Sequence, residues 1–201
     1  MNDILEHIDP DNHDEVIAAT VRAIGKRGPD PATRLQATAG AAGHAVVSVA
    51  LGESVTKLWL TRGLGPDGLS RWSDHIERAG GPVVGRMTVV AEQPELALHL
   101  AASALAGFAG EIAAGLSHPT SYLDQRLHAR RICKSIDLAL GLLTGESYRR
   151  ALDVCEAVIR ENRRQFDALR ASLNCAMELS AGQIAKRLEG IVPVALSCGA
   201  S

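Results

Sequence analysis

Four polar side chains between positions 124 and 135 have types and a spacing that could support chemistry. They recur at intervals of four, three and four residues, which puts them on one face of a helix: Asp124, His128, Arg131 and Ser135. A carboxylate, an imidazole and a guanidinium within reach of one another could form an acid–base pair or anchor a ligand. The same pattern describes a solvated helix face with ion pairs between turns, and we favour that interpretation. A helical enzyme using the first three residues is therefore the last of three hypotheses, and no catalytic residue is expected.

A second polar group, near the N-terminus, contains residue types that bind metals: Asp9, Asp11, His13 and Asp14. Pro10 and the lack of a glycine do not suit a calcium loop. Acidic residues ahead of a helix ordinarily cap its first turn and interact favourably with its dipole. We therefore interpret this segment as helix capping.

The remaining chemical motifs are missing from the chain. Four cysteines are present, but their spacing is too wide for a zinc site: Cys133, Cys155, Cys175 and Cys198. The sequence has no Walker loop, no dinucleotide-binding fingerprint, no HExxH and no nucleophile elbow. We expect no metal and no cofactor.

Composition indicates a helical protein. The 201 residues are 46% hydrophobic and only 3% aromatic, and alanine dominates the apolar residues, which favours helices over sheets. The net charge of −2 argues against a generally basic nucleic-acid-binding surface. The most apolar run, 96–116, is interrupted by His99 and Glu111 and is not a clean membrane span. No signal peptide is visible, so we expect a cytoplasmic, all-α protein with no membrane partner.

Three short helical patterns occupy the first quarter of the chain. The first ends at Gly28, the second follows Thr33 in the position of a helix N-cap, and Gly43 separates the second from a third segment, His44 to Leu51. Three small helices with a glycine turn between the second and third form the layout of a helix-turn-helix unit.

At these residues the sequence resembles the TetR family of bacterial transcriptional regulators. The matching positions are Arg27-Gly28, Thr33, Leu35, Ala39 and Ala42-Gly43, and a second island is Glu92 with Pro94-Glu95-Leu96-Ala97. Members usually carry aromatic residues where this chain has Ala50 and Glu53. The resemblance implies a small three-helix head, residues 1–53, and a larger helical body for ligand binding and dimerisation, residues 54–201.

The resemblance also implies a function and its residues. A homodimer would bind operator DNA and respond to a small molecule. Phosphate contacts would come from three residues and base contacts from three more: Thr33, Arg34 and Lys57, then His44, Val47 and Ser48. The recognition segment lacks the Arg and Asn that make the best bidentate base contacts. The alternative is therefore a TetR-like protein that has lost DNA binding and acts through protein partners or a ligand.

Long apolar stripes at 120–144 and 146–178 fit the dimerisation helices of such proteins. The interface residues would be Ile136, Leu140, Leu152, Cys155, Val158, Ile159 and Asn162. Asn162, a polar residue inside the stripe, could fix the register of the partner helices. The last helical pattern runs from Glu146 to about Glu189, and a break is expected near 180–182.

The few large side chains of the body suggest a ligand cavity near Trp72, Met87, His99 and Phe108, although we favour the simpler interpretation that they fill the core. Two helices, 54–62 and 67–79, are expected to join head and body around the break at Gly63 to Pro66. The β-branched segment 83–90 could instead be a strand, with 45–61 as the one candidate partner.

Overall fold

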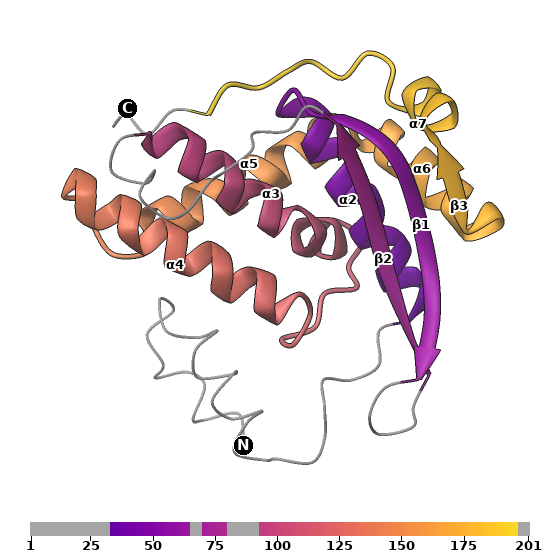
Figure 1. Ribbon diagram of the computed structural model, residues 1–201, viewed down its shortest axis with the longest axis horizontal. Helices are drawn as coiled ribbons and strands as arrows, with labels where there is room; N and C mark the ends of the chain where they lie inside the picture. The colour runs from indigo at the N-terminus through magenta and orange to yellow at the C-terminus, as the bar shows by residue number, and fades with distance from the viewer. Residues whose placement is uncertain (1–32, 65–69, 80–92, 197–201) are drawn as a thin grey trace.

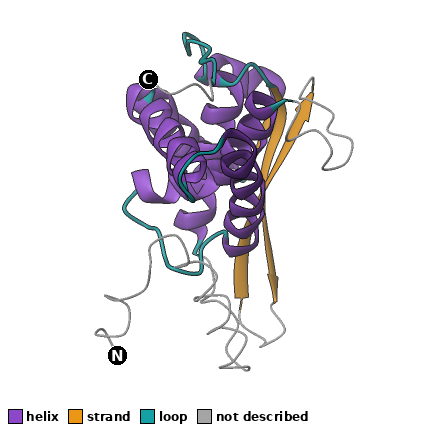
Figure 2. Ribbon diagram, turned by 90° about the vertical axis from the view of Figure 1, so that its left-hand side faces the viewer, coloured by secondary structure: helices purple, strands orange, loops and turns teal. Residues whose placement is uncertain are grey.

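The computed structural model describes residues 33–64, 70–79 and 93–196, and it is mainly helical with a small antiparallel sheet (Figure 1). The elements follow in the order α2 (Arg34–Ala50), β1 (Ser54–Leu64), β2 (Ser70–Ala79), α3 (Pro94–Ala113), α4 (Leu123–Leu140), α5 (Glu146–Glu161), α6 (Arg163–Ala176), β3 (Glu178–Ser180) and α7 (Ala181–Arg187). Figure 2 shows the strands along one side of the helices.

Helix α2 is the central element of the fold. Every residue from Ala37 to Ser48 is buried, because α2 contacts α3, α5, α6 and both strands of the hairpin. A helix that is apolar on all sides is stable only when other elements surround it. The predicted N-cap is confirmed. The Thr33 hydroxyl accepts a hydrogen bond from the Gln36 N–H (3.2 Å), and the Gln36 side chain accepts one from the Thr33 N–H (2.8 Å).

The predicted helix-turn-helix turn at Ala42-Gly43 is absent, because α2 runs through this position without a break. Gly43 serves a different purpose, which is the close approach of α2 to α3. A Cβ atom at Gly43 would lie 2.4 Å from the Ala106 carbonyl oxygen, and one at Gly110 would lie 2.3 Å from the Ala39 carbonyl oxygen. The backbones of the two helices therefore touch, and only glycine fits at the crossing.

The prediction of an all-α protein is wrong, because residues 54–64 and 70–79 form a β-hairpin rather than two helices. In the register, Leu58 faces Ile76 and Trp59 faces His75. Leu58 and Leu60 are buried while Trp59 between them is only partly buried, which is the two-residue alternation of a half-buried strand. A shift in register between Val55 and Lys57 interrupts this alternation. The shift made the apolar spacing look helical.

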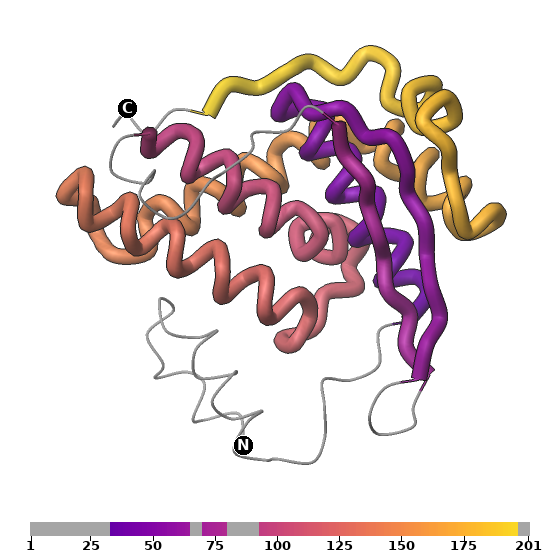
Figure 3. The backbone as a smooth tube through the Cα atoms, viewed as in Figure 1, coloured from indigo at the N-terminus to yellow at the C-terminus, as the bar shows by residue number. Residues whose placement is uncertain are grey.

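The C-terminal half also differs from the predicted long helix. The chain breaks at Asn162 and again at Met177, whose φ is +61°, and then adds the short strand β3 to the free side of β1. Beyond α7 an extended segment runs back across the molecule (Figure 3), and the Val194 N–H donates to the Ala50 carbonyl at 2.6 Å. The break at Met177 turns the chain so that β3 pairs with the edge of β1 and α7 packs against both strands.

Helix α3 lies in the middle of the helical layer and packs on α2, α4 and α5. It begins at Pro94, as predicted, since proline suits the first position of a helix. Among the described helices, α3 alone is long and apolar enough to span a membrane by length and composition, and 61% of that window is buried within the fold. Core helices share this property, so it does not indicate a membrane protein.

Candidate functional site

Buried and half-buried polar side chains lie where β2 packs on α2 and along the neighbouring helix α3. They recur one helical turn apart, His44 and Ser48 on α2, then His99, Ser103 and, two turns further on, Glu111 on α3. From the sheet, Asp74 and Arg78 point toward the helices because they alternate with the outward side chains of β2. We call this set, together with Glu53 and Tyr122, the polar network.

His44 is a neutral imidazole at the centre of the network. Its Nδ1 atom lies 3.4 Å from Arg78 Nη2, and its Nε2 atom lies 4.0 Å from Asp74 Oδ2. Arginine can only donate, so Nδ1 accepts and the ring proton is on Nε2, on the side of Asp74. The ring also hydrogen bonds to the Ser103 carbonyl. Burial lowers the pKa of His44 below its usual value, against the opposing effect of Asp74.

Glu53 is the anionic end of the network. It accepts a hydrogen bond from His99 Nε2 at 2.9 Å and lies 3.3 Å from Arg78 Nε, and the Ser103 hydroxyl is 3.5 Å away. Burial alone would raise the pKa of Glu53. The His99 hydrogen bond and the charge of Arg78 outweigh burial and hold this pKa below its usual value. The carboxylate therefore ties the turn after α2 to both α3 and β2.

Tyr122 reaches the network from the turn before α4. Its backbone is left-handed, with φ of +52°, and its ring packs edge-on against His44 with 5.7 Å between centroids. The hydroxyl bonds to Asp74 and lies directly over Gly40, where a Cβ atom would be 1.7 Å from the phenol oxygen. Burial raises the pKa of Tyr122 well above its usual value, so the phenol is a permanent donor.

Glu111 completes the network on α3. Burial raises its pKa to about 7, a hydrogen bond from Ser121 opposes the shift, and the charge of Asp74 adds to it. Among the described residues, Glu111 Oε2 is buried without a hydrogen-bond partner. The network thus contains one group, the Glu111 carboxyl, whose pKa of about 7 places its change of protonation near neutrality. Tyr122 fills the space over Gly40 and Gly107, which leaves no room there for a ligand. The chemistry of the polar network is therefore proton binding within a packed core.

The residues predicted to bind DNA do not share one surface. His44, Val47 and Ser48, assigned to base edges, are buried inside the subunit. Arg34 donates to the Asn174 carbonyl and stacks on Trp72 at 5.3 Å, so α6 and β2 cover it. Thr33 caps α2, and Lys57 lies on β1, 3.1 Å from Glu178.

The residues predicted to line a ligand cavity are likewise separated. Trp72 packs under Arg34 on β2, His99 belongs to the polar network, and Phe108 is covered by the Arg126 guanidinium at 4.1 Å. Met87 lies outside the described residues. The three described side chains therefore fill different parts of the core.

The predicted acid–base face of α4 is solvated. Asp124, His128 and Arg131 are all exposed, and within the described part of the chain none of them pairs with another. The hydroxyl of Ser135 bonds to the Arg131 carbonyl in its own helix at 3.1 Å. This arrangement supports the solvated-face interpretation.

The residues predicted to form a dimer interface are mostly buried within one subunit. Ile136, Cys155, Val158 and Ile159 are covered, Leu152 and Asn162 are half-buried, and Leu140 is 42% exposed. The stripe on α5 packs against α3 and α4, so it does not need a second chain to cover it. A homodimer stays a prediction.

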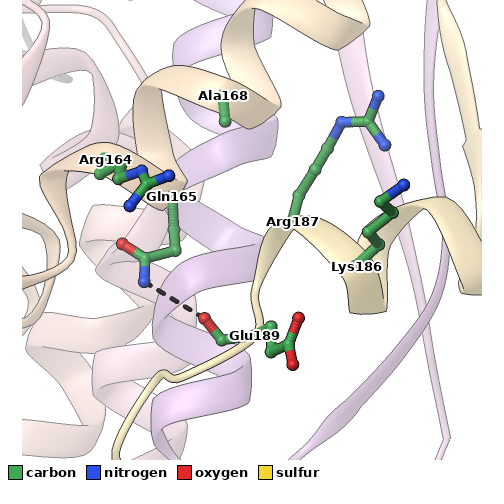
Figure 4. Close-up of a pocket in the computed structure, with 6 residues that line it drawn as sticks. All are labelled: Arg164, Gln165, Ala168, Lys186, Arg187 and Glu189. Carbon is green, nitrogen blue, oxygen red and sulfur yellow. Dashed lines mark hydrogen bonds between the residues drawn. The ribbon is translucent and has the colours of Figure 1, made fainter.

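A cleft of about 550 Å³ lies between α6 and α7 and is lined mainly by cations (Figure 4). Its residues are Arg164, Gln165 and Ala168 from α6, and Lys186, Arg187 and Glu189 from α7 and the turn after it. The Gln165 amide donates to the Glu189 carbonyl at 3.3 Å, which joins the two sides. We call this the basic cleft.

Only one of the three cations in the basic cleft is held in place by the protein. The Arg187 guanidinium donates to the Ser172 hydroxyl and to the Gln183 carbonyl. Within the described residues Arg164 and Lys186 make no hydrogen bond or ion pair. The lining contains three cations and a single carboxylate, that of Glu189, so the cleft carries an excess of positive charge.

Sequence patterns pointed to few of these residues. No residue of the basic cleft was predicted as a site residue from the sequence, and Lys186 and Arg187 reach the cleft only because the chain turns back after Met177. The spacing of His99, Ser103 and Glu111 on an otherwise apolar helix was the available signal for the polar network.

No family model matches the chain, and no curated protein matches it.

Proposed function

We propose that this protein is a binding protein for an anionic group, a phosphate or a carboxylate, which it holds in the basic cleft. The observation that carries the proposal is the pair Arg164 and Lys186, two cations that have no partner among the described residues and that line a cleft of ligand size. This proposal follows the alternative drawn from the sequence, in which the chain acts through a ligand or partner without reading DNA.

The chemistry of the cleft suits a multiply charged oxyanion. Arginine binds phosphate or carboxylate in a bidentate manner, and lysine adds a point charge on a flexible stem. Arg187 is already oriented by Ser172, which lowers the entropy lost on binding. Because Arg164 and Lys186 are exposed, each contact contributes only about 0–1 kcal/mol. Three such contacts give at most about 3 kcal/mol, so Kd for inorganic pyrophosphate should be on the order of 10 mM or weaker.

The test is a ¹⁵N–¹H NMR titration of the full chain with inorganic pyrophosphate and, separately, with citrate at low ionic strength. We expect shifts at α6 and α7 that saturate, that weaken with added salt, and that are at least fivefold weaker in the double variant Arg164→Ala, Lys186→Ala. The preference between the two probes distinguishes a phosphate site from a carboxylate site.

The matched control is Arg149→Ala. Arg149 lines a second cleft, on α5, of about 540 Å³, where Glu146 and Asp153 balance the charge. Loss of binding in the control, or no binding of either anion at low salt, would overturn the proposal. A short DNA duplex serves as a third probe. Salt-dependent duplex binding that survives the double variant would instead support the regulator predicted from the sequence.

A further inference from the structure

Glu111, Tyr122 and Asp74 come from three separate elements and lie close enough to interact electrostatically. Glu111 is on α3, Tyr122 is in the turn before α4, and Asp74 is on the edge strand β2. We propose that these residues form a proton-operated latch that holds the β-hairpin against the helices, closed when Glu111 is protonated and weakened when it is ionised. This inference is independent of the basic cleft.

The contacts of the latch form a continuous chain. Ser121 donates from its hydroxyl to the Glu111 carboxylate, and its oxygen accepts the His118 N–H at 3.1 Å. The next residue, Tyr122, hydrogen bonds to Asp74 across the space that Gly40 leaves open. The positions of Ser121 and Tyr122 are coupled through the left-handed backbone at Tyr122, a conformation that costs energy for a bulky residue. A change at Glu111 therefore reaches β2 through two adjacent residues.

Charged and titratable groups surround the latch on every side. They are His44 on α2, Glu53 in the turn after α2, Asp74 and Arg78 on β2, His99 on α3, His118 and Tyr122 between α3 and α4, and Arg126 on α4. Arg78 faces Glu53, and Arg126 donates to the Pro119 and Ser121 carbonyls. An ionised Glu111 therefore faces the Asp74 carboxylate, which is a repulsive pair.

The direction of the pH effect follows from this geometry. In the closed latch, burial and Asp74 raise the pKa of Glu111 to about 7, whereas a solvated carboxyl in the open latch ionises near 4.5. Between these two pKa values the open form binds fewer protons than the closed form. Opening therefore becomes more favourable as pH rises from about 4.5 to about 7, and above pH 7 the opening equilibrium no longer changes through Glu111. The full effect on the opening equilibrium is at most on the order of 300-fold, and solvent screening reduces it.

His44 acts in the opposite direction, because its pKa is lowered in the closed form. Opening should therefore become easier as pH falls below 6.5. The two effects partly cancel in the wild-type protein. The informative quantity is therefore the hydrogen-exchange protection of β2 in a variant that removes only the Glu111 titration, divided by the protection of β2 in the wild type. Glu111→Gln keeps the shape of the side chain and cannot ionise.

The experiment is hydrogen exchange of the full chain, followed by mass spectrometry from pH 5 to pH 8 and corrected for the intrinsic pH dependence of exchange. We expect protection of β2 in Glu111→Gln and wild type to be similar at pH 5. By pH 7.5 the protection of β2 in Glu111→Gln should exceed that in the wild type by tenfold or more. Protection of α5 should change equally in the two proteins. Tyr122→Phe should weaken β2 protection over the whole range.

The control variant is Glu161→Gln, at the exposed end of α5, which should follow the wild type. A ratio that does not depend on pH would overturn the latch. So would a ratio that rises equally in β2 and α5, because Glu111 would then affect the stability of the whole fold rather than one contact. If Glu111→Gln fails to fold, the Tyr122→Phe profile decides: unchanged β2 protection would also overturn it.

Discussion

Gly43→Ala tests the backbone contact between α2 and α3. The new Cβ atom would lie 2.4 Å from the Ala106 carbonyl oxygen, and real contacts of this kind are not shorter than 3.0 Å, so the helices must separate by about 0.6 Å. Overpacking of this kind costs about 1–3 kcal/mol. The higher helix propensity of alanine returns about 0.5–1 kcal/mol, so we expect a net loss of roughly 0–2.5 kcal/mol, centred near 1 kcal/mol, in the free energy of unfolding.

Urea unfolding followed by circular dichroism measures this loss as a lower midpoint at unchanged slope. The matched control is Gly182→Ala in α7, because a Cβ atom at Gly182 meets nothing within 4 Å. That substitution should leave stability unchanged or raise it by up to about 1 kcal/mol. If Gly43→Ala were as stable as Gly182→Ala, the close helix crossing would be refuted.

Three other substitutions test the core. Asp137→Ala removes a buried carboxylate that accepts the N–H groups of Gly145 (2.8 Å) and Ser147 (3.0 Å) at the start of α5, so thermal unfolding should show a loss of about 1–3 kcal/mol. Glu53 has a lowered pKa in the folded protein, so its ionised carboxylate stabilises the fold above pH 4.5 and this stabilisation is lost on acidification. In Glu53→Gln the free energy of unfolding should therefore fall less steeply as pH is lowered. Val158→Asp buries an unpaired charge and should lower the free energy of unfolding by several kcal/mol at every protein concentration. A loss of stability that depends on protein concentration would instead indicate a dimer.

The hairpin was predictable in part. Gly65-Pro66-Asp67-Gly68 stands between the two strands, and these are turn residues, but the sequence analysis took the break as the gap between two helices. The deciding information was the pairing of Trp59 with His75, whose rings stack at 5.1 Å, and such a cross-strand pair is visible only once the register is known.

The sites were harder to predict than the helices, because they depend on contacts between distant residues. Asp74 and Arg78 belong to the polar network only because the hairpin packs on α2. Lys186 and Arg164 line the same cleft only because β3 and α7 fold back toward α6. Local patterns predicted the start of α2 at Thr33 and of α3 at Pro94, since a cap or a first-turn proline depends on its immediate neighbours.

Four of the five described residues that matched the TetR pattern in its first island have another role or setting in this fold. Thr33 is a helix cap, the Ala39 carbonyl lies against Gly110, and Gly43 allows the helix crossing. Leu35, which an amphipathic second helix would bury, is 50% exposed. Caps and small residues at helical spacing arise wherever two helices pack closely, so a short match built from them indicates helix packing as readily as a DNA-binding unit. Measuring duplex binding directly, with the basic cleft intact and mutated, is therefore more informative about this chain than the match itself.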